Sequence, residues 1–121
     1  MYIIFGESAA TEVAQTNLVL EVDTIRLMPM NATAKSYCVL EQVNSDPAML
    51  ENNKKIHEDL IRQYRLQNWD YCIKAIKGLR GAWGGQLDEF YNSLLERVVN
   101  FSANPVDNWD YAVMREVILP S

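Results

Sequence analysis

The sequence has one histidine, His57, and two cysteines, Cys38 and Cys72. With a single histidine, one chain cannot assemble a two-histidine metal site or an ordinary catalytic triad. The two cysteines lie far apart, without the close spacing of a zinc or redox motif, so we expect two buried free thiols. No pattern of residues indicates catalysis, a metal site or a cofactor.

The sequence also lacks a long hydrophobic run. Its first apolar stretch, Tyr2–Phe5, ends after four residues and follows no basic segment. This pattern argues against a signal peptide and a membrane-spanning helix. We therefore expect a cytoplasmic protein that has no membrane partner.

Basic residues are outnumbered by acidic ones, with a net charge of −5 and a pI near 4.8. Nonspecific binding to nucleic acid or to an anionic membrane requires a basic surface, so nucleic acid is not an expected partner. Residues 54–80 are an exception. They hold seven basic and three acidic residues, which gives +4 and leaves −9 for the rest of the chain.

The remaining composition is that of a globular protein, with 49% apolar and 22% charged residues in a chain of 121. A chain of this length forms one hydrophobic core, so we expect a single domain over residues 1–121. The sequence pattern changes near Asp46. Residues 1–45 favour strands, and residues 46–121 favour helices.

The first part contains three β-forming runs, at residues 2–5, 18–27 and 36–43. Charged and apolar residues alternate in the second run, as in a half-buried strand. A turn over residues 29–33 joins the second and third runs into an antiparallel hairpin, beside which the first run is expected to pair. Residues 8–15 have the composition of a short helical turn.

The second part begins with Asp46-Pro47, a cap followed by proline, and predicts a helix to about Gln67. Asn68 caps a second helix, in which Trp69, Cys72, Ile73, Ile76 and Leu79 form one apolar face. Gly81 is expected to end this helix.

A third helix follows Gly84-Gly85, with the strongest amphipathic pattern of the chain over residues 87–98. Asn104-Pro105 ends it. Asp107-Asn108 then caps a final short helix, which includes Trp109, Ala112 and Val113.

The sequence Asn68-Trp69-Asp70-Tyr71 recurs forty residues later, at positions 108–111, each time at an expected helix start. Two interpretations stay open. The copies mark a duplicated helical unit, or both use asparagine as a cap, aspartate in the first turn and tryptophan as an anchor.

Few side chains of the helical part are placed for chemistry. His57 has charged neighbours on one side and apolar ones nearby, so we expect it at the edge of a helix face. Asp88, Glu89 and Glu96 share one helix, but Asp88 and Glu89 are successive and point in different directions, and Glu96 lies two turns beyond. A solvated helix face therefore explains them better than an acid–base pair or a magnesium site.

Residues 81–85 are rich in glycine and precede a helix, a geometry in which backbone amides can hold a phosphate. The lysine and hydroxyl of a P-loop are missing, so a tight interhelical turn with Trp83 packed on the helices is the competing interpretation. The residues of a ligand site here would be Lys74, Lys77, Arg80, Trp83, Gly84 and Gly85.

The basic stretch is partly neutralised by two expected ion pairs, Glu58 with Arg62 and Asp70 with Lys74. Aromatic residues are abundant in the helical part, which is typical of a protein interface and equally of a well-filled core. The candidate interaction surface comprises Arg62, Arg65, Tyr71, Tyr91 and Trp109.

One resemblance covers most of the chain. It is carried by His57, Tyr64, Arg65, Asn68, Trp69, Cys72, Leu79, Gly81 and residues 83–91. These residues resemble a group of short proteins of tailed phages that infect marine cyanobacteria. The resemblance brings no assigned catalytic residue. It implies a viral accessory or virion-associated protein in the cytoplasm of an infected bacterium.

The sequence as a whole predicts an α+β fold, in which an N-terminal antiparallel sheet of about three strands packs against three or four C-terminal helices. The best-fitting function is noncatalytic interaction with another protein or with a second copy of the chain. The alternative is a small-molecule or nucleotide-binding domain that uses the Trp83-Gly84-Gly85 turn.

Overall fold

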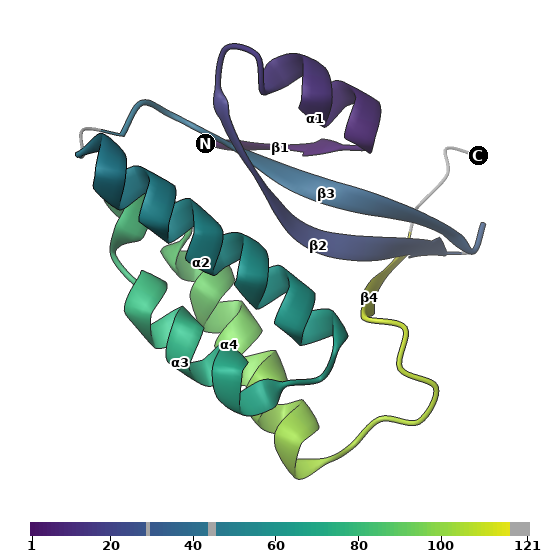
Figure 1. Cartoon of the computed structure of the whole chain (residues 1–121). Helices are drawn as coiled ribbons and strands as arrows, with labels where there is room; N and C mark the ends of the chain where they lie inside the picture. Colours follow the sequence, from purple (N-terminus) through teal and green to yellow (C-terminus); the bar gives the residue numbers. More distant parts are fainter. Residues whose placement is uncertain (29, 44–45, 117–121) are drawn as a thin grey trace.

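A computed structural model describes residues 1–28, 30–43 and 46–116. The elements in chain order are β1 (Tyr2–Phe5), α1 (Glu7–Val13), β2 (Leu18–Met28), β3 (Ala32–Leu40), α2 (Pro47–Arg65), α3 (Trp69–Leu79), the 3-10 turn η1 (Ala82–Gly85), α4 (Asp88–Ala103) and β4 (Ala112–Glu116). The predicted α+β class is confirmed. Figure 1 shows α1 on one side of the sheet and the layer of α2, α3 and α4 on the other.

The sheet has four strands in the order β1-β3-β2-β4. Antiparallel pairing of β2 with β3, and of β1 with β3, confirms the predicted hairpin and the predicted place of the first strand. The hairpin turn includes Pro29, which lies outside the described residues. β4 pairs in parallel with β2. The prediction of about three antiparallel strands is therefore corrected to a mixed sheet of four.

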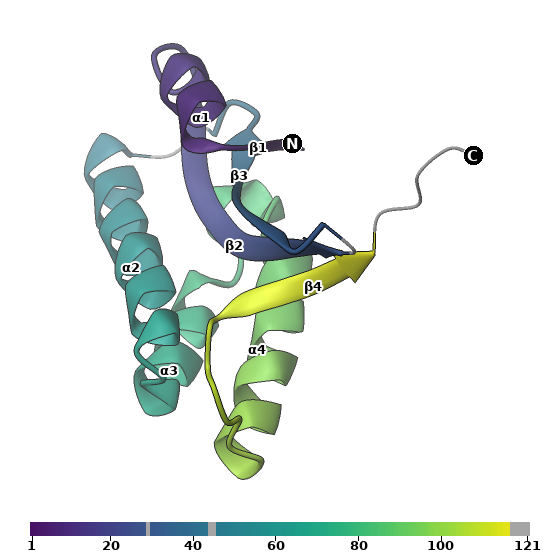
Figure 2. The same cartoon turned by 90° about the vertical axis from the view of Figure 1, so that its right-hand side faces the viewer.

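The final helix predicted through Trp109, Ala112 and Val113 is wrong. Ala112 and Val113 instead begin β4, which Figure 2 shows alongside β2. Asp110 does not act in a first helical turn. Its carboxylate accepts a hydrogen bond from the Ala112 amide at 3.2 Å and from Arg26 of β2 at 2.6 Å. These two contacts hold the chain in position to enter the sheet.

A β-bulge interrupts the pairing of β2 with β3 between Glu21 and Thr24. The buried hydroxyl of Ser36 satisfies the backbone there, because it donates to the Asp23 carbonyl at 3.0 Å and accepts from the Asp23 amide at 3.2 Å. The Asp23 carboxylate then accepts a hydrogen bond from Arg97 of α4 at 3.1 Å. The bulge thus joins the sheet to the helical layer.

The ends of α2 and α3 follow the predicted signals with one exception. The Asp46 side chain caps α2 by accepting from the Ala48 amide, and Gly81 follows α3 with a left-handed φ of 82°. Asn68 precedes α3, but its side chain donates to Gln63 at 3.1 Å and does not cap the helix.

The main core lies between the sheet and the layer of α2, α3 and α4. Leu20, Cys38 and Leu40 of the sheet pack there against Leu60, Ile76 and Leu94 of the helices. Cys38 and Cys72 are buried free thiols, as predicted, and burial raises the pKa of each to about 11.

Candidate functional site

The glycine-rich turn is occupied by the protein's own groups. Trp83 is 2% exposed, and its indole Nε1 donates to the Tyr91 hydroxyl at 2.9 Å. The Gly81 amide donates to Asp88 Oδ1 at 2.9 Å, so a carboxylate of the chain already lies where a bound phosphate would accept this bond. Gly84 is exposed and Gly85 half-buried.

The basic residues considered with this turn do not converge on Trp83. Lys74, Lys77 and Arg80 are exposed, whereas the Trp83 side chain faces the core. The interpretation of residues 81–85 as an interhelical turn with a packed tryptophan describes this geometry.

The residues of the candidate interaction surface fall in separate places. Tyr91 is fully buried and contributes no surface. Arg65 and Trp109 are neighbours, because the Trp109 indole donates to the Arg65 carbonyl at 3.0 Å. Arg62 and Tyr71 line a different feature, a shallow cleft on α2 and α3.

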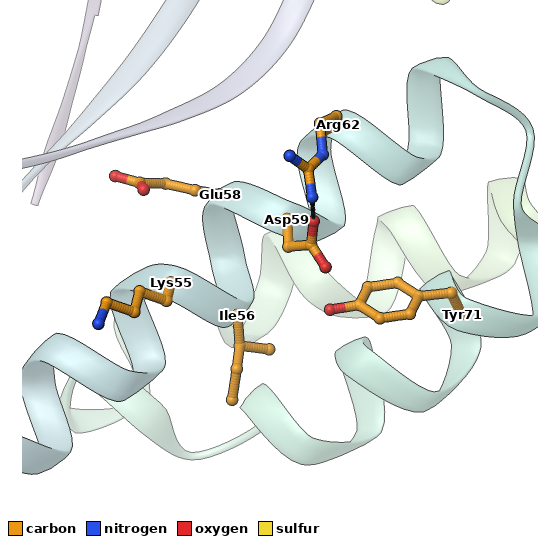
Figure 3. Close-up of a pocket in the computed structure, with 6 residues that line it drawn as sticks. All are labelled: Lys55, Ile56, Glu58, Asp59, Arg62 and Tyr71. Carbon is orange, nitrogen blue, oxygen red and sulfur yellow. Dashed lines mark hydrogen bonds and ion pairs between the residues drawn. The ribbon is translucent and has the colours of Figure 1, made fainter.

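This cleft has a volume of about 420 Å³ and is lined by Lys55, Ile56, Glu58, Asp59, Arg62 and Tyr71. Figure 3 shows Arg62 turned toward Asp59, so the expected pair of Arg62 with Glu58 is replaced by a pair with Asp59. The nearby Tyr71 hydroxyl lowers the pKa of the Asp59 carboxyl, and this carboxylate raises the pKa of Tyr71 to about 12. Two cations and two carboxylates balance, which leaves no net charge to attract an ion.

The prediction that His57 lies at the edge of a helix face is wrong. The side chain is fully buried. Its Nε2 lies 2.7 Å from the Glu21 carbonyl, which only accepts, so Nε2 carries the proton. Nδ1, 2.8 Å from the Tyr91 hydroxyl, then accepts the Tyr91 proton. Since Trp83 donates to Tyr91, the chain of hydrogen bonds from Trp83 through Tyr91 and His57 to Glu21 is complete.

Burial keeps the His57 imidazole neutral within this chain of hydrogen bonds. Burial lowers its pKa, because the charged imidazolium would lose its hydration, although the Glu21 carbonyl partly opposes this effect. A neutral, fully bonded and buried imidazole has no access to a substrate. His57 therefore joins α2 to β2 and α4 as a structural group.

Other classes of site are also missing from the described part of the chain. Among residues 1–28, 30–43 and 46–116, no three His, Cys, Asp or Glu side chains gather as the ligands of a metal ion would. No helix within the same ranges is both long and apolar enough to cross a bilayer.

The most unusual surface is the edge of the sheet at β1, which the sequence analysis did not single out. Tyr2, Ile3 and Phe5 are 54%, 45% and 54% exposed, although all three are large and apolar. Among the residues that the structure describes, β1 forms an outer edge of the sheet and pairs with β3 alone. An uncharged strand at such an edge presents a row of backbone donors and acceptors to the solvent.

A sequence signal for this edge exists. Tyr2–Phe5 has four successive large apolar residues, without the lysine, proline or inward-pointing charge by which soluble proteins protect their edge strands. The signal has meaning only once β1 is known to lie at the edge, and strand order cannot be read from the sequence.

Comparisons with known proteins found no matching family model, no matching curated protein and no matching solved structure. Functional inference for this chain therefore rests on its own residues and geometry.

Proposed function

We propose that the protein is a noncatalytic interaction protein, and that the open edge of β1 receives an extended segment of a partner polypeptide. The observation that carries this proposal is the exposure of Tyr2, Ile3 and Phe5 on an uncharged edge strand. In this mode of recognition, backbone hydrogen bonds supply affinity and the alternating side chains supply specificity.

The noncatalytic part of the proposal is supported by where the reactive groups lie. His57 and Tyr91 are buried in a complete chain of hydrogen bonds. The thiols of Cys38 and Cys72 are buried with raised pKa values, which disfavours the nucleophilic thiolate. These side chains stabilise the fold and are not available to a substrate.

The alternative, a small-molecule or nucleotide-binding domain at the Trp83-Gly84-Gly85 turn, has less support. The Trp83 side chain faces the core, and the Gly81 amide already donates its hydrogen bond to Asp88. The resemblance to phage proteins belongs to the first proposal, in which the protein acts as an accessory or virion-associated component inside an infected bacterium.

A capture experiment with two matched variants tests the proposed role. Ile3→Lys places a charge on the β1 edge, whereas Val99→Lys places the same charge at an exposed apolar position of α4. We expect the wild type and Val99→Lys to capture the same proteins from a bacterial lysate or from themselves, and Ile3→Lys to lose them. Identical capture by all three proteins would contradict the proposal.

A further inference from the structure

We infer that the strand received by β1 is β1 of a second copy, antiparallel and related by a two-fold axis perpendicular to the sheet. This inference rests on the proposed function, because it names the partner of the same edge. Three observations support it: the direction of the free backbone groups of β1, the ability of two β1 strands to pair about a two-fold axis, and the lack of charge on the strand.

The pairing of β1 with β3 shows which backbone groups are free. The Gly6 amide donates to the Lys35 carbonyl at 2.9 Å, and the register places Ile4 opposite Tyr37 and Tyr2 opposite Val39. Hydrogen-bonded and non-hydrogen-bonded pairs alternate in an antiparallel ladder. Ile3 and Phe5 therefore belong to the non-hydrogen-bonded pairs, and their N–H and C=O groups point to the open side.

A two-fold axis perpendicular to the sheet restricts how two such edges can pair. The axis keeps each face of the sheet on the same side, so a residue must lie opposite one from its own face. Two central registers satisfy this condition, one with Ile3 opposite Ile3 of the other copy and one with Ile4 opposite Ile4. In the first register, the outward N–H and C=O groups of Ile3 face those of Ile3 in the other copy. In the second, the outward groups of Ile3 face those of Phe5.

The side chains of the edge suit a second copy. Pairing would extend the sheet across both molecules and cover Tyr2 on one face and Ile3 and Phe5 on the other, all of them about half-exposed in one chain. The strand Tyr2–Phe5 carries no charge, so two copies meet there without local repulsion. A four-residue contact is smaller than a standard interface of about 1,600 Å², and we expect association in the micromolar range.

The overall charge gives this interface a characteristic salt dependence. Each chain carries −5, so two copies repel one another beyond the contact itself. Salt screens this repulsion, with a screening length of about 8 Å at physiological ionic strength. The dimer should therefore become stronger as salt is added, whereas an interface held by ion pairs would become weaker.

Sedimentation equilibrium tests the inference directly. We expect the wild type and Val99→Lys to change from monomer toward dimer between about 1 µM and 1 mM, and Ile3→Lys to remain monomeric over the same range. Because Ile3 is exposed and its amide points away from β3, the Ile3→Lys chain should fold normally, which circular dichroism and the thermal midpoint will show.

Cysteine cross-linking tests the geometry. Residues on the two-fold axis lie about 4.5–5.5 Å apart between their Cα atoms, which is within the span of a disulfide. In a Cys38→Ser background, which removes the free thiol directly opposite Ile3 on β3, Ile3→Cys or Ile4→Cys should therefore oxidise to a covalent dimer. Val99→Cys in the same background should not, and the remaining native cysteine, Cys72, is buried and free.

The outcomes separate the inference from the proposed function. A wild type that stays monomeric at about 1 mM overturns the inference, and so does equal dimerisation of Ile3→Lys. If the monomeric wild type captures a different protein that Ile3→Lys loses, the proposed function stands and only the second copy is excluded as its partner.

Discussion

At the scale of single residues, the fold depends on buried polar side chains whose partners come from distant parts of the chain. Ser36 satisfies both backbone groups of Asp23 at the bulge, and His57 connects the Glu21 carbonyl to Tyr91. Each of these groups would be costly to bury if its partner were removed.

Ser36→Ala tests the bulge. The substitution leaves the amide and the carbonyl of Asp23 without the hydroxyl that pairs with them, so we expect the free energy of unfolding to fall by about 1–3 kcal/mol. Urea denaturation measures the change. Thr33→Ala, at an exposed position of the same strand, is the control and should change stability little. Equal effects of the two substitutions would contradict this role of Ser36.

His57 predicts a pH dependence of stability. Its pKa in the folded protein is below the ordinary value of 6.5, so the unfolded chain binds the proton more readily. The stabilisation is complete above pH 6.5 and is lost as the pH falls toward the folded pKa, by up to about 1.4 kcal/mol per pH unit. Asp59 and Asp110 also have lowered pKa values, but the stability that they contribute is complete above their ordinary value of 3.8 and is lost only below it.

Urea denaturation of the wild type and of His57→Gln at pH 5, 6, 7 and 8 checks this dependence. We expect the variant to be less stable at neutral pH but to lack the decline between about pH 6.5 and 5. The same decline in both proteins would show that another group titrates.

At the scale of elements, the sequence patterns located the helices better than the sheet. The predicted helix from Asp46 to Gln67 corresponds to α2, Pro47–Arg65, because its cap and apolar spacing are local signals. β4 was missed because Asn108-Trp109-Asp110 resembles a helix start, whereas pairing with β2 depends on residues more than eighty positions away. The buried position of His57 and the edge position of β1 have the same non-local origin.

The two copies of the repeated motif meet in the structure but form different elements. Trp69 begins α3 and Trp109 precedes β4, and their rings pack perpendicular to each other with centroids 5.3 Å apart. Tyr64 and Phe101 complete this aromatic cluster. The predicted role of each tryptophan as an anchor against the core is confirmed, and the helix start at Asn108 is not.

Trp109→Ala tests how the segment before β4 is held. The substitution removes the aromatic contacts and the hydrogen bond to the Arg65 carbonyl at the end of α2. We expect a loss of about 2–4 kcal/mol, and Trp109→Phe should retain most of the packing and lose about 1 kcal/mol. Thermal unfolding measures both. A loss no larger than that of Met49→Ala, at an exposed site, would contradict the anchor.

At the scale of the whole molecule, the covering of the sheet is uneven. One side of the sheet carries α1, the other carries α2, α3 and α4, and α2 reaches the Leu18–Glu21 end of β2 through His57. β1 forms the edge of the sheet opposite β4, and its apolar side chains are about half-exposed. The proposed interaction is the covering of this edge by another strand.

Amide hydrogen exchange detects a second strand at the β1 edge, because it reports each backbone group separately. Ile4 is in a hydrogen-bonded pair with β3, so its amide should be protected at every concentration, whereas the amides of Ile3 and Phe5 point outward. Exchange at Ile3 and Phe5 should slow as the protein concentration rises from about 10 µM to 1 mM. Rapid exchange at Ile3 and Phe5 that is independent of concentration would contradict pairing with a second copy.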